Sequence, residues 1–367
     1  MNVGSTFLSV GVAIGLASAS SIAVIVIAKV RRVRVGVSAR AMLAPYRLGL
    51  VAMASGEDEG GQAKFALCAL PSPIWARLRP SVVAFLPKVR GLPADDLTEL
   101  MRAHGEIDEA GRMLSSRSAV RRARAAYLLG LMRDTDSVVL LVPLLNEPVA
   151  DVRMVAARAL GTIGDPSAAS AVLRALRTQH GHIGLPAWVA AEALLAMGSG
   201  IEPALQIGLA SQDPAVRHVC AVVAGHGTYL LAAPQLRILL ATDGDGDVRV
   251  SAAVALGRLG GADDAATLAR HAHASESTVL RRTCATALGD LGHREGMEAL
   301  TELLGDGDRR LAELAADSLV RIGSEGIARL EEAAATPLQG PSARAARGAL
   351  ELAGMRGQLV ASDSGSS

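Results

Sequence analysis

Histidines are the side chains of this 367-residue sequence that are best suited to metal binding or proton transfer, and the chain contains eight of them. They fall in loose pairs, such as His180 with His182, in loops or at the ends of predicted helices. A metal ion needs three or four converging ligands, and these pairs have no cysteine or carboxylate at ligand spacing. Phosphate-binding loops, nucleophile elbows and dinucleotide fingerprints do not occur in the sequence either. We therefore predict no metal site, no cofactor and no catalytic residue, and a protein that is not an enzyme.

The acidic run DGDGD at residues 243–247 has the composition of a calcium loop. A calcium-binding loop that begins at Asp243 requires glycine at position 248 and glutamate at position 254, and both residues are valine. A similar run, GDGD at 305–308, stands at the matching point of a later sequence repeat. We therefore interpret both runs as loops between repeats, with Asp247 capping the helix that follows.

Four arginines recur at one position of the repeated sequence: Arg153, Arg217, Arg249 and Arg281. They could form a basic binding ridge. They could instead form a ladder, in which each arginine bonds an acidic or carbonyl group, such as that of Asp151 or Asp247, between neighbouring repeats. Specific binding sites are local, so recurrence in so many copies favours the ladder.

The stretch DVRMVAARALGTIGDP, residues 151–166, predicts the elements that carry these side chains. Its apolar residues recur at steps of three and one, which places them on one stripe of an α-helix. Asp151 can cap the start of this helix, Gly164 can end it, and Asp165-Pro166 can open a second helix. The unit is a helical hairpin with one apolar face, which must stack on copies of itself.

Copies of this hairpin follow one another at a regular spacing. Counted from Gly130, the matching residue recurs after 31, 34, 30, 32, 32, 31 and 31 residues. This spacing predicts seven complete hairpins and a truncated eighth at 341–360. Cys220 and Cys284 take the place of small buried alanines, so we interpret them as apolar filling. We predict an all-α fold, an α-solenoid of helical hairpins over residues 119–360, preceded by one transmembrane helix.

The consensus V-R-x-x-A-A-x-A-L-G-x-I-G-D-P resembles HEAT repeats, in particular the short HEAT-like type also found in phycobilisome lyases. A solenoid offers a long concave surface, which we expect the second helices of the hairpins to line. Residues there that differ between copies mix both signs of charge, which suits a protein partner more than a nucleic acid. The residues predicted to bind a partner on the concave face are Arg174, Arg177, Gln235, Arg237, Arg270, His271, Glu298, Glu302 and Arg329.

Residues 7–28 form a run of 22 residues without a charge. A helix of this length crosses a hydrocarbon core of about 30 Å. A cleaved signal peptide would need basic residues before the run, whereas they follow it, in residues 29–40. We predict a single-pass protein of the cell membrane, with residues 1–6 extracytoplasmic and the solenoid cytoplasmic. The side chains expected to contact lipid headgroups are Lys29, Arg31, Arg32 and Arg34.

Small residues at Gly11, Gly15 and Ala19 share one face of the predicted membrane helix. Such a face lets two membrane helices approach closely, which indicates a possible homodimer. Residues 41–118 lack the clear repeat, and we interpret them as diverged helical hairpins that cap the solenoid. They could instead lie on the membrane through Trp75, Val82, Val83 and Phe85. The tail at 361–367 is predicted to be disordered.

The whole layout resembles a group of bacterial membrane proteins with one N-terminal membrane helix, a basic collar and HEAT repeats. Such proteins resemble accessory factors, some of them beside membrane-bound processive glycosyltransferases. The resemblance implies a membrane-tethered adaptor or scaffold whose partner is itself a membrane protein. An enzyme of the bilin-lyase or metal-hydroxylase kind is the alternative that the repeat type implies. A nucleic-acid binder is disfavoured, because residues 119–367 hold 23 basic and 27 acidic side chains.

Overall fold

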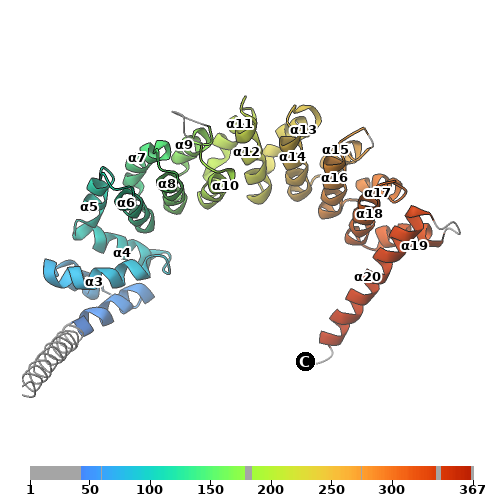
Figure 1. Cartoon of the computed structure of the whole chain (residues 1–367). Helices are drawn as coiled ribbons and strands as arrows, with labels where there is room; N and C mark the ends of the chain where they lie inside the picture. Colours follow the sequence, from blue (N-terminus) through green and yellow to red (C-terminus); the bar gives the residue numbers. More distant parts are fainter. Residues whose placement is uncertain (1–42, 59, 178–183, 274, 336–339, 365–367) are drawn as a thin grey trace, which may run out of the picture. The chain divides into compact units, whose positions relative to one another are not determined.

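The computed structural model describes residues 43–58, 60–177, 184–273, 275–335 and 340–364 (Figure 1). The chain divides into two compact units, Met1–Glu109 and Ala110–Ser367, and each is treated by itself. Every regular element in the described part of the chain is a helix. The predicted membrane helix at 7–28 and the basic segment at 29–40 lie outside the described residues. Within the described residues, no helix is both long enough and apolar enough to span a bilayer.

The described part of the first unit is a small helical body with its own core. Residues 43–55 form its first helix, and three further helices follow within the unit: α2 (Gln62–Cys68), α3 (Ser72–Phe85) and α4 (Leu92–Ala103). The ring of Trp75 stacks on His104 with centroids 3.9 Å apart, and Trp75 Nε1 donates to Glu106 Oε1 at 2.7 Å. Trp75 and Val82 are buried in this core, so neither is available to rest on a membrane as the alternative interpretation required. The unit ends at Glu109, within the helix Glu106–Met113, whereas the sequence places the boundary at 118.

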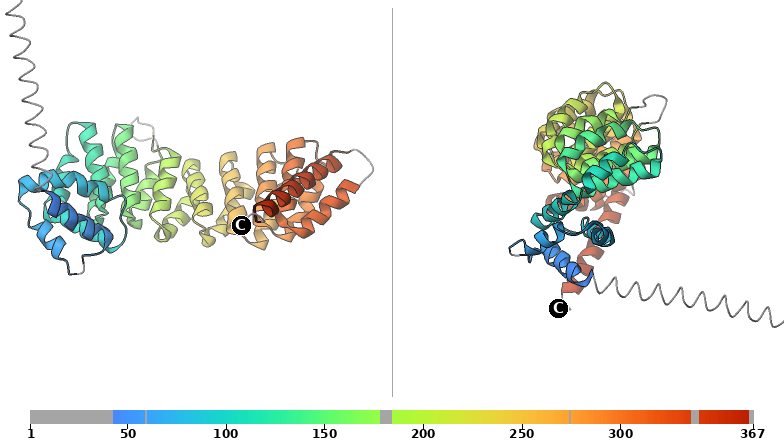
Figure 2. Two further views of the ribbon diagram at one scale, coloured as in Figure 1. Left: turned by 90° about the horizontal axis from the view of Figure 1, so that it is seen from below. Right: turned by 90° about the vertical axis from the view of Figure 1, so that its left-hand side faces the viewer.

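The second unit, Ala110–Ser367, consists of consecutive helix pairs that follow α5 (Glu106–Met113) along the chain (Figure 1 and, seen from below, Figure 2). The first helices of the pairs are α6 (Ala119–Met132), α8 (Ala150–Ile163), α10 (Ala187–Ala196), α12 (Pro214–His226), α14 (Gly246–Leu259), α16 (Thr278–Leu291), α18 (Arg309–Ile322) and α20 (Pro341–Ser364). The second helices are α7 (Val138–Leu141), α9 (Ala169–Arg174), α11 (Glu202–Leu209), α13 (Ala233–Thr242), α15 (Ala262–Arg270), α17 (Met297–Leu303) and α19 (Ser324–Ala335). This order confirms the helical hairpins that the sequence spacing predicts.

The limits of α8 show how the repeated sequence specifies its helices. Its buried stripe includes Val152, Ala156 and Leu160, as the apolar periodicity predicts. Gly164 ends the helix with φ 82°, in the left-handed region that glycine tolerates best. The predicted cap at Asp151 is wrong, because the helix begins at Ala150 and this aspartate lies within its first turn. A carboxylate there still interacts favourably with the positive end of the helix dipole.

Consecutive first helices pack through a glycine on one helix and a small residue on the next. A Cβ added to Gly130 would lie 2.7 Å from Ala159 Cα, and one added to Gly257 would lie 2.7 Å from Ala287 Cβ. Gly161, Gly225 and Gly289 make the same kind of approach to the following helix. The glycine that recurs in the sequence is therefore the point at which two helix backbones meet.

This close packing determines the direction in which the second unit curves. The first helices lie against each other along their row, whereas the second helices touch each other much less. In Figure 1 the first helices consequently lie on the inner side of the curve and the second helices on its outer side. We expected the second helices to line the concave side, and the structure places them in the opposite row.

Two cysteines take the place of a small alanine in the buried stripe of the first helices. Cys220 and Cys284 are fully buried at the position of Ala156, and burial raises the pKa of both thiols to about 12. They are apolar filling, as predicted.

In α20, Arg347 and Glu351 occupy the positions at which α8 has Ala157 and Gly161, and both are exposed. Charged side chains at these positions prevent another helix from packing on α20, so the stack ends there.

Candidate partner-binding face

The recurring arginines form a ladder along the second unit. Arg217 Nη1 donates to the carbonyl oxygens of Ser211 and Gln212, in the loop before its own helix, at 2.8 and 3.0 Å. The other side of the guanidinium binds the carboxylate of Asp243, in the loop before the next first helix, at 2.7 and 2.8 Å. Arg217 therefore ties two consecutive loops together, which is the ladder and not the binding ridge.

A similar arrangement recurs at Arg249 and Arg281. Arg249 donates to Leu240 O at 2.8 Å and to Glu276 Oε1 at 2.6 Å, and Arg281 donates to Ala272 O and to the Asp306 carboxylate. Arg153 donates to the carbonyl oxygens of Glu147 and Pro148. Sequence reasoning missed one rung, Arg122, which binds Glu147 Oε2 at 2.8 Å and sits beside a second arginine in the sequence. The predicted partners Asp151 and Asp247 are not the acids used, because the bonded carboxylates lie in the loops between hairpins.

The ladder lowers the pKa of two of its carboxyl groups. The guanidinium of Arg217 holds the pKa of Asp243 below its ordinary value of 3.8. Hydrogen bonds from Arg249 and His271 do the same for the pKa of Glu276, below its ordinary value of 4.5. His271, which we predicted to bind a partner, is half-buried and bonded to Glu276 at 2.8 Å. Its side chain thus belongs to the ladder.

The acidic runs between repeats are loops, as predicted. Asp245 caps α14 by accepting from the amides of Asp247 and Val248 at 2.9 and 3.1 Å. Asp308 caps α18 in the same way. Asp247 was predicted to be the cap, but it lies inside the first turn of α14. Among the described residues, no three histidine, cysteine or acidic side chains are grouped so that they could hold a metal ion.

The residues predicted to bind a partner lie on or beside the second helices, in the outer row. Arg177 pairs with Asp213 at 3.2 Å and Arg237 with Asp264 at 3.0 Å, while Arg329 pairs with Glu332 within its own helix. Arg174, Arg270, Glu298 and Glu302 are exposed and Gln235 is half-buried. Their role in partner binding stays a prediction, now for the outer row of the unit.

The concave side is formed instead by first-helix residues opposite the buried stripe. In α8 this side includes Arg158, because a residue two positions from Ala156 points away from the core. We call this surface the inner face. We define it by residues of successive first helices that match Arg158 of α8, or the positions four residues before and after it. These residues are Tyr127, Arg158, Trp188, Glu192, Val222, His226, Val250, Val254, Arg258, Thr286, Asp290, Glu313, Asp317 and Arg321.

The N-terminal part of the inner face holds exposed aromatic side chains. Tyr127 and Trp188 are 52% and 59% exposed, in a chain with only 2% aromatic residues. The guanidinium of Arg158 lies over the Trp188 ring, 5.1 Å from its centroid, and its Nε donates to Glu192 at 3.2 Å. Tyr127, Arg158 and Glu192 line a hollow of about 320 Å³ between α6, α8 and α10. Sequence reasoning missed them because it assigned the concave side to the other row of helices.

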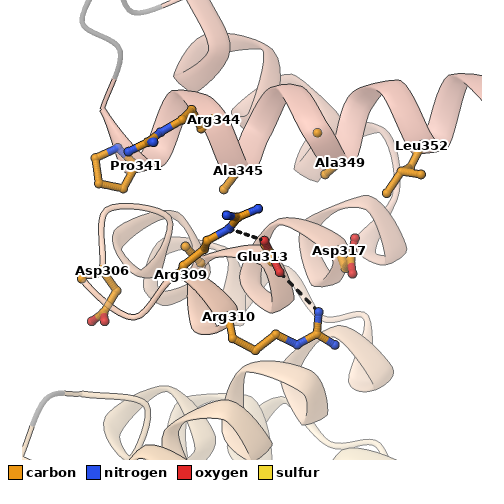
Figure 3. Close-up of a pocket in the computed structure, with 13 residues that line it drawn as sticks. Asp306, Arg309, Arg310, Glu313, Asp317, Pro341, Arg344, Ala345, Ala349 and Leu352 are labelled. Carbon is orange, nitrogen blue, oxygen red and sulfur yellow. Dashed lines mark hydrogen bonds and ion pairs between the residues drawn. The ribbon is translucent and has the colours of Figure 1, made fainter.

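The central and C-terminal parts of the inner face have different chemistry. Between α12 and α14, Val222 and Val254 line a small hollow of about 90 Å³ beside His226, which accepts a hydrogen bond from Arg258 Nη1 at 2.7 Å. Between α18 and α20, a hollow of about 440 Å³ is lined by charged side chains together with small and apolar residues (Figure 3). There Glu313 accepts from both Arg309 and Arg310. The inner face thus changes from aromatic to aliphatic to charged along the unit.

Comparison with protein families identifies HEAT repeats at residues 107–199 and 271–351. These matched segments include hairpins from both ends of the stack, and the hairpins between them have the same order of helices. The HEAT repeats predicted from the sequence consensus are confirmed in these two segments. A search of curated proteins finds no match to the sequence.

Several solved structures are similar to this chain at low identity. Human deoxyhypusine hydroxylase is 18% identical, with a TM-score of 0.30 over 86% of this chain and 99% of its own. YibA of Escherichia coli is 16% identical, with a TM-score of 0.40 over 74% and 95%. The phycocyanin lyase complex of CpcE and CpcF from Nostoc is 20% identical, with a TM-score of 0.27 over 75% and 92%. At these scores we carry no activity over from any of them.

Proposed function

We propose that this protein is a membrane-tethered adaptor whose HEAT repeats hold a partner protein on the inner face. One observation carries the proposal. In five of the first helices the position that packs on the next helix is a glycine, as at Gly130 and Gly257. The inner-face positions beside them change from hairpin to hairpin, as at Tyr127, Arg158 and Val254. A surface that varies on a constant scaffold is what recognition of an irregular partner requires.

The charges of the inner face favour a protein as the partner. Acidic and basic side chains pair across neighbouring helices, as in Arg158 with Glu192 and Arg321 with Asp290. A nucleic-acid surface would instead need unbalanced positive charge along the groove. A mixed surface with exposed aromatic anchors is typical of protein interfaces.

The membrane tether in this proposal rests on the sequence. The uncharged run at 7–28 is long enough to span a bilayer, and the basic residues of 29–40 follow it. In this arrangement the HEAT repeats lie at the cytoplasmic surface, and their local concentration near another membrane protein is raised without new contacts. The partner would then be a membrane protein, for example a processive glycosyltransferase. Pairing of two chains through Gly11, Gly15 and Ala19 would bring two inner faces together.

A pull-down from detergent-solubilised native membranes tests the proposal. The bait is the full chain, with a variant that lacks residues 1–40 beside it, and captured proteins are identified by mass spectrometry. We expect one stoichiometric membrane protein, captured more weakly by the shortened bait. If neither bait captures a stoichiometric protein, the adaptor function is wrong.

A further inference from the structure

We infer that the hollow between α6, α8 and α10 binds a short segment of the partner in which a carboxylate side chain stands next to a large apolar one. The inference rests on the proposed function, because it takes the inner face as the binding surface. It adds the chemistry that this surface recognises. This chemistry follows from two parts of the hollow: the guanidinium of Arg158 and the apolar floor beside it.

Arg158 is held in place with its two terminal nitrogens still available. Its Nε donates to Glu192 Oε2 at 3.2 Å, and its guanidinium carbon lies over the Trp188 ring, 5.1 Å from the centroid. Among the described residues, none accepts a hydrogen bond from Arg158 Nη1 or Nη2. A fixed guanidinium with a free pair of N–H groups matches the two oxygens of a carboxylate.

The neighbouring Glu192 restricts which anion fits. Its carboxylate already neutralises part of the charge of Arg158, and its own side chain is 54% exposed at the rim of the hollow. A phosphate group carries nearly two charges and binds best where several cations converge. A single carboxylate needs only the one guanidinium that the hollow offers. The chemistry therefore favours an aspartate or glutamate side chain over a phosphorylated residue.

The floor of the hollow is apolar. Leu131, Val155, Ala159, Ala193 and Ala196 line it, with the hydroxyl of Thr162 already donating to Arg158 O at 2.8 Å. The volume of about 320 Å³ accommodates one large aliphatic or aromatic side chain.

Exposed rings complete the site. Tyr127 lines the hollow, and Trp188, which supports Arg158, leaves much of its own surface free. Partly exposed aromatic side chains of this kind commonly anchor protein interfaces.

Two other hollows described on the inner face lack the exposed aromatic side chains of this one. In the central hollow Arg258 donates to His226, and in the C-terminal hollow Arg309 and Arg310 both bind Glu313 (Figure 3). Neither hollow has an aromatic ring among its described lining residues, apart from the imidazole of His226. The site that combines a guanidinium, an apolar floor and exposed aromatic rings is therefore assigned to the N-terminal part of the inner face.

Fluorescence anisotropy with the full chain in detergent tests the inference. The probes are fluorescein-labelled peptides that carry glutamate close to leucine or phenylalanine, each with a twin in which glutamine replaces glutamate. We expect the glutamate peptides to bind more tightly than their twins by about tenfold, since one charge-assisted pair contributes about 1.4 kcal/mol or more. Equal binding of a peptide and its glutamine twin would overturn the inference.

Substitutions in and beside the hollow test whether the peptides bind there. We expect Arg158→Gln to abolish the preference for glutamate and Arg158→Lys to weaken binding, because lysine keeps the charge but lacks the planar pair of donors. Trp188→Ala should weaken every peptide of the set. The matched control is Arg294→Gln, an exposed arginine between α16 and α17 that also pairs with one carboxylate, and it should bind like the parent. Unchanged binding by Arg158→Gln would contradict the inference.

The outcome is separable from that of the proposed function. If the full chain captures a membrane protein but binds no peptide of the set, the assigned chemistry is wrong and the adaptor function stands. If peptides bind with the expected preference and no partner is captured, the adaptor function is wrong. In that case the hollow is a peptide site with another use.

Discussion

Arg217 of one helical hairpin binds Asp243 through two parallel hydrogen bonds, Nε to Oδ2 at 2.7 Å and Nη2 to Oδ1 at 2.8 Å, in the loop that leads to the next hairpin. The carboxylate is almost fully buried, with 3% of its side chain exposed. The same guanidinium also holds two carbonyl oxygens of its own loop. One side chain thus sets the distance between two hairpins, and the orientation of the inner face depends on such rungs.

Removing this rung should destabilise the stack. We expect Arg217→Ala to lower the free energy of unfolding by about 3 kcal/mol, because it leaves a buried carboxylate without its partner. The measurement is urea unfolding followed by circular dichroism. Arg294→Ala is the matched control, because Arg294 pairs with Glu325 at the surface and is 72% exposed; it should cost less than about 1 kcal/mol. Equal losses in the two variants would mean that the rung does not couple the hairpins.

The ladder also predicts a pH dependence of stability. The pKa of Asp243 is lowered in the folded state by Arg217, and that of Glu276 by Arg249 and His271. A lowered carboxyl pKa stabilises the fold fully above the ordinary value of the unfolded chain, near 4, and this stabilisation is lost as the pH falls below it.

We expect the unfolding free energy to fall between about pH 6 and pH 3, and to fall less in Arg217→Ala, where the pKa of Asp243 is no longer lowered. Unfolding midpoints in urea at the two pH values give the comparison. If the variant loses as much stability on acidification as the parent, Asp243 is not a source of the acid sensitivity.

The glycine contacts between first helices give a third prediction. Gly257→Ala should destabilise the unit by about 1–3 kcal/mol, because the new Cβ would lie 2.7 Å from Ala287 Cβ. Gly348→Ala is the control in another first helix, where no atom lies within 4 Å of the added Cβ. That change should be neutral or stabilise by up to about 1 kcal/mol through helix propensity. A thermal unfolding temperature that is unaffected by Gly257→Ala would show that the helices do not meet there.

Much of the fold could be predicted from local sequence pattern. The apolar stripe through Val152, Ala156 and Leu160 and the stop at Gly164 are properties of one helix, and the regular spacing identifies the copies. Cys220 and Cys284 could be assigned because they replace a residue whose burial the pattern already predicts. Each of these inferences needs no knowledge of how hairpins pack on one another.

The concave row could not be predicted in this way, because it depends on contacts between hairpins. The curve follows from the approach of residues such as Gly130 and Ala159, about one repeat apart in sequence. For the same reason the acid that Arg217 binds, Asp243, was missed in favour of Asp247. Tyr127 and Trp188 are ordinary helix residues in the sequence, and only their place on the inner face makes them candidates.

The proposed membrane topology predicts which end of the chain is accessible from outside the cell. We expect Asn2→Cys to react with a membrane-impermeant maleimide in intact cells, and Ser366→Cys to react only after the cells are opened. Cys220 and Cys284 are buried and should contribute little background labelling. Labelling of the parent chain, which has no added cysteine, measures this background and that of Cys68. Labelling of Ser366→Cys in intact cells would reverse the topology, and labelling of neither variant in intact cells would argue against the membrane span.

The most direct test of the adaptor account is photocrosslinking in native membranes from single positions of the full chain. Benzoylphenylalanine at Val254, Thr286 or Asp317 samples the inner face, and the same group at Ile207, Arg174 or Glu302 samples the outer row. We predict that one membrane protein is crosslinked from the inner-face positions and not from the outer row. Crosslinks to a partner from the outer row alone, or from neither row, would contradict the account.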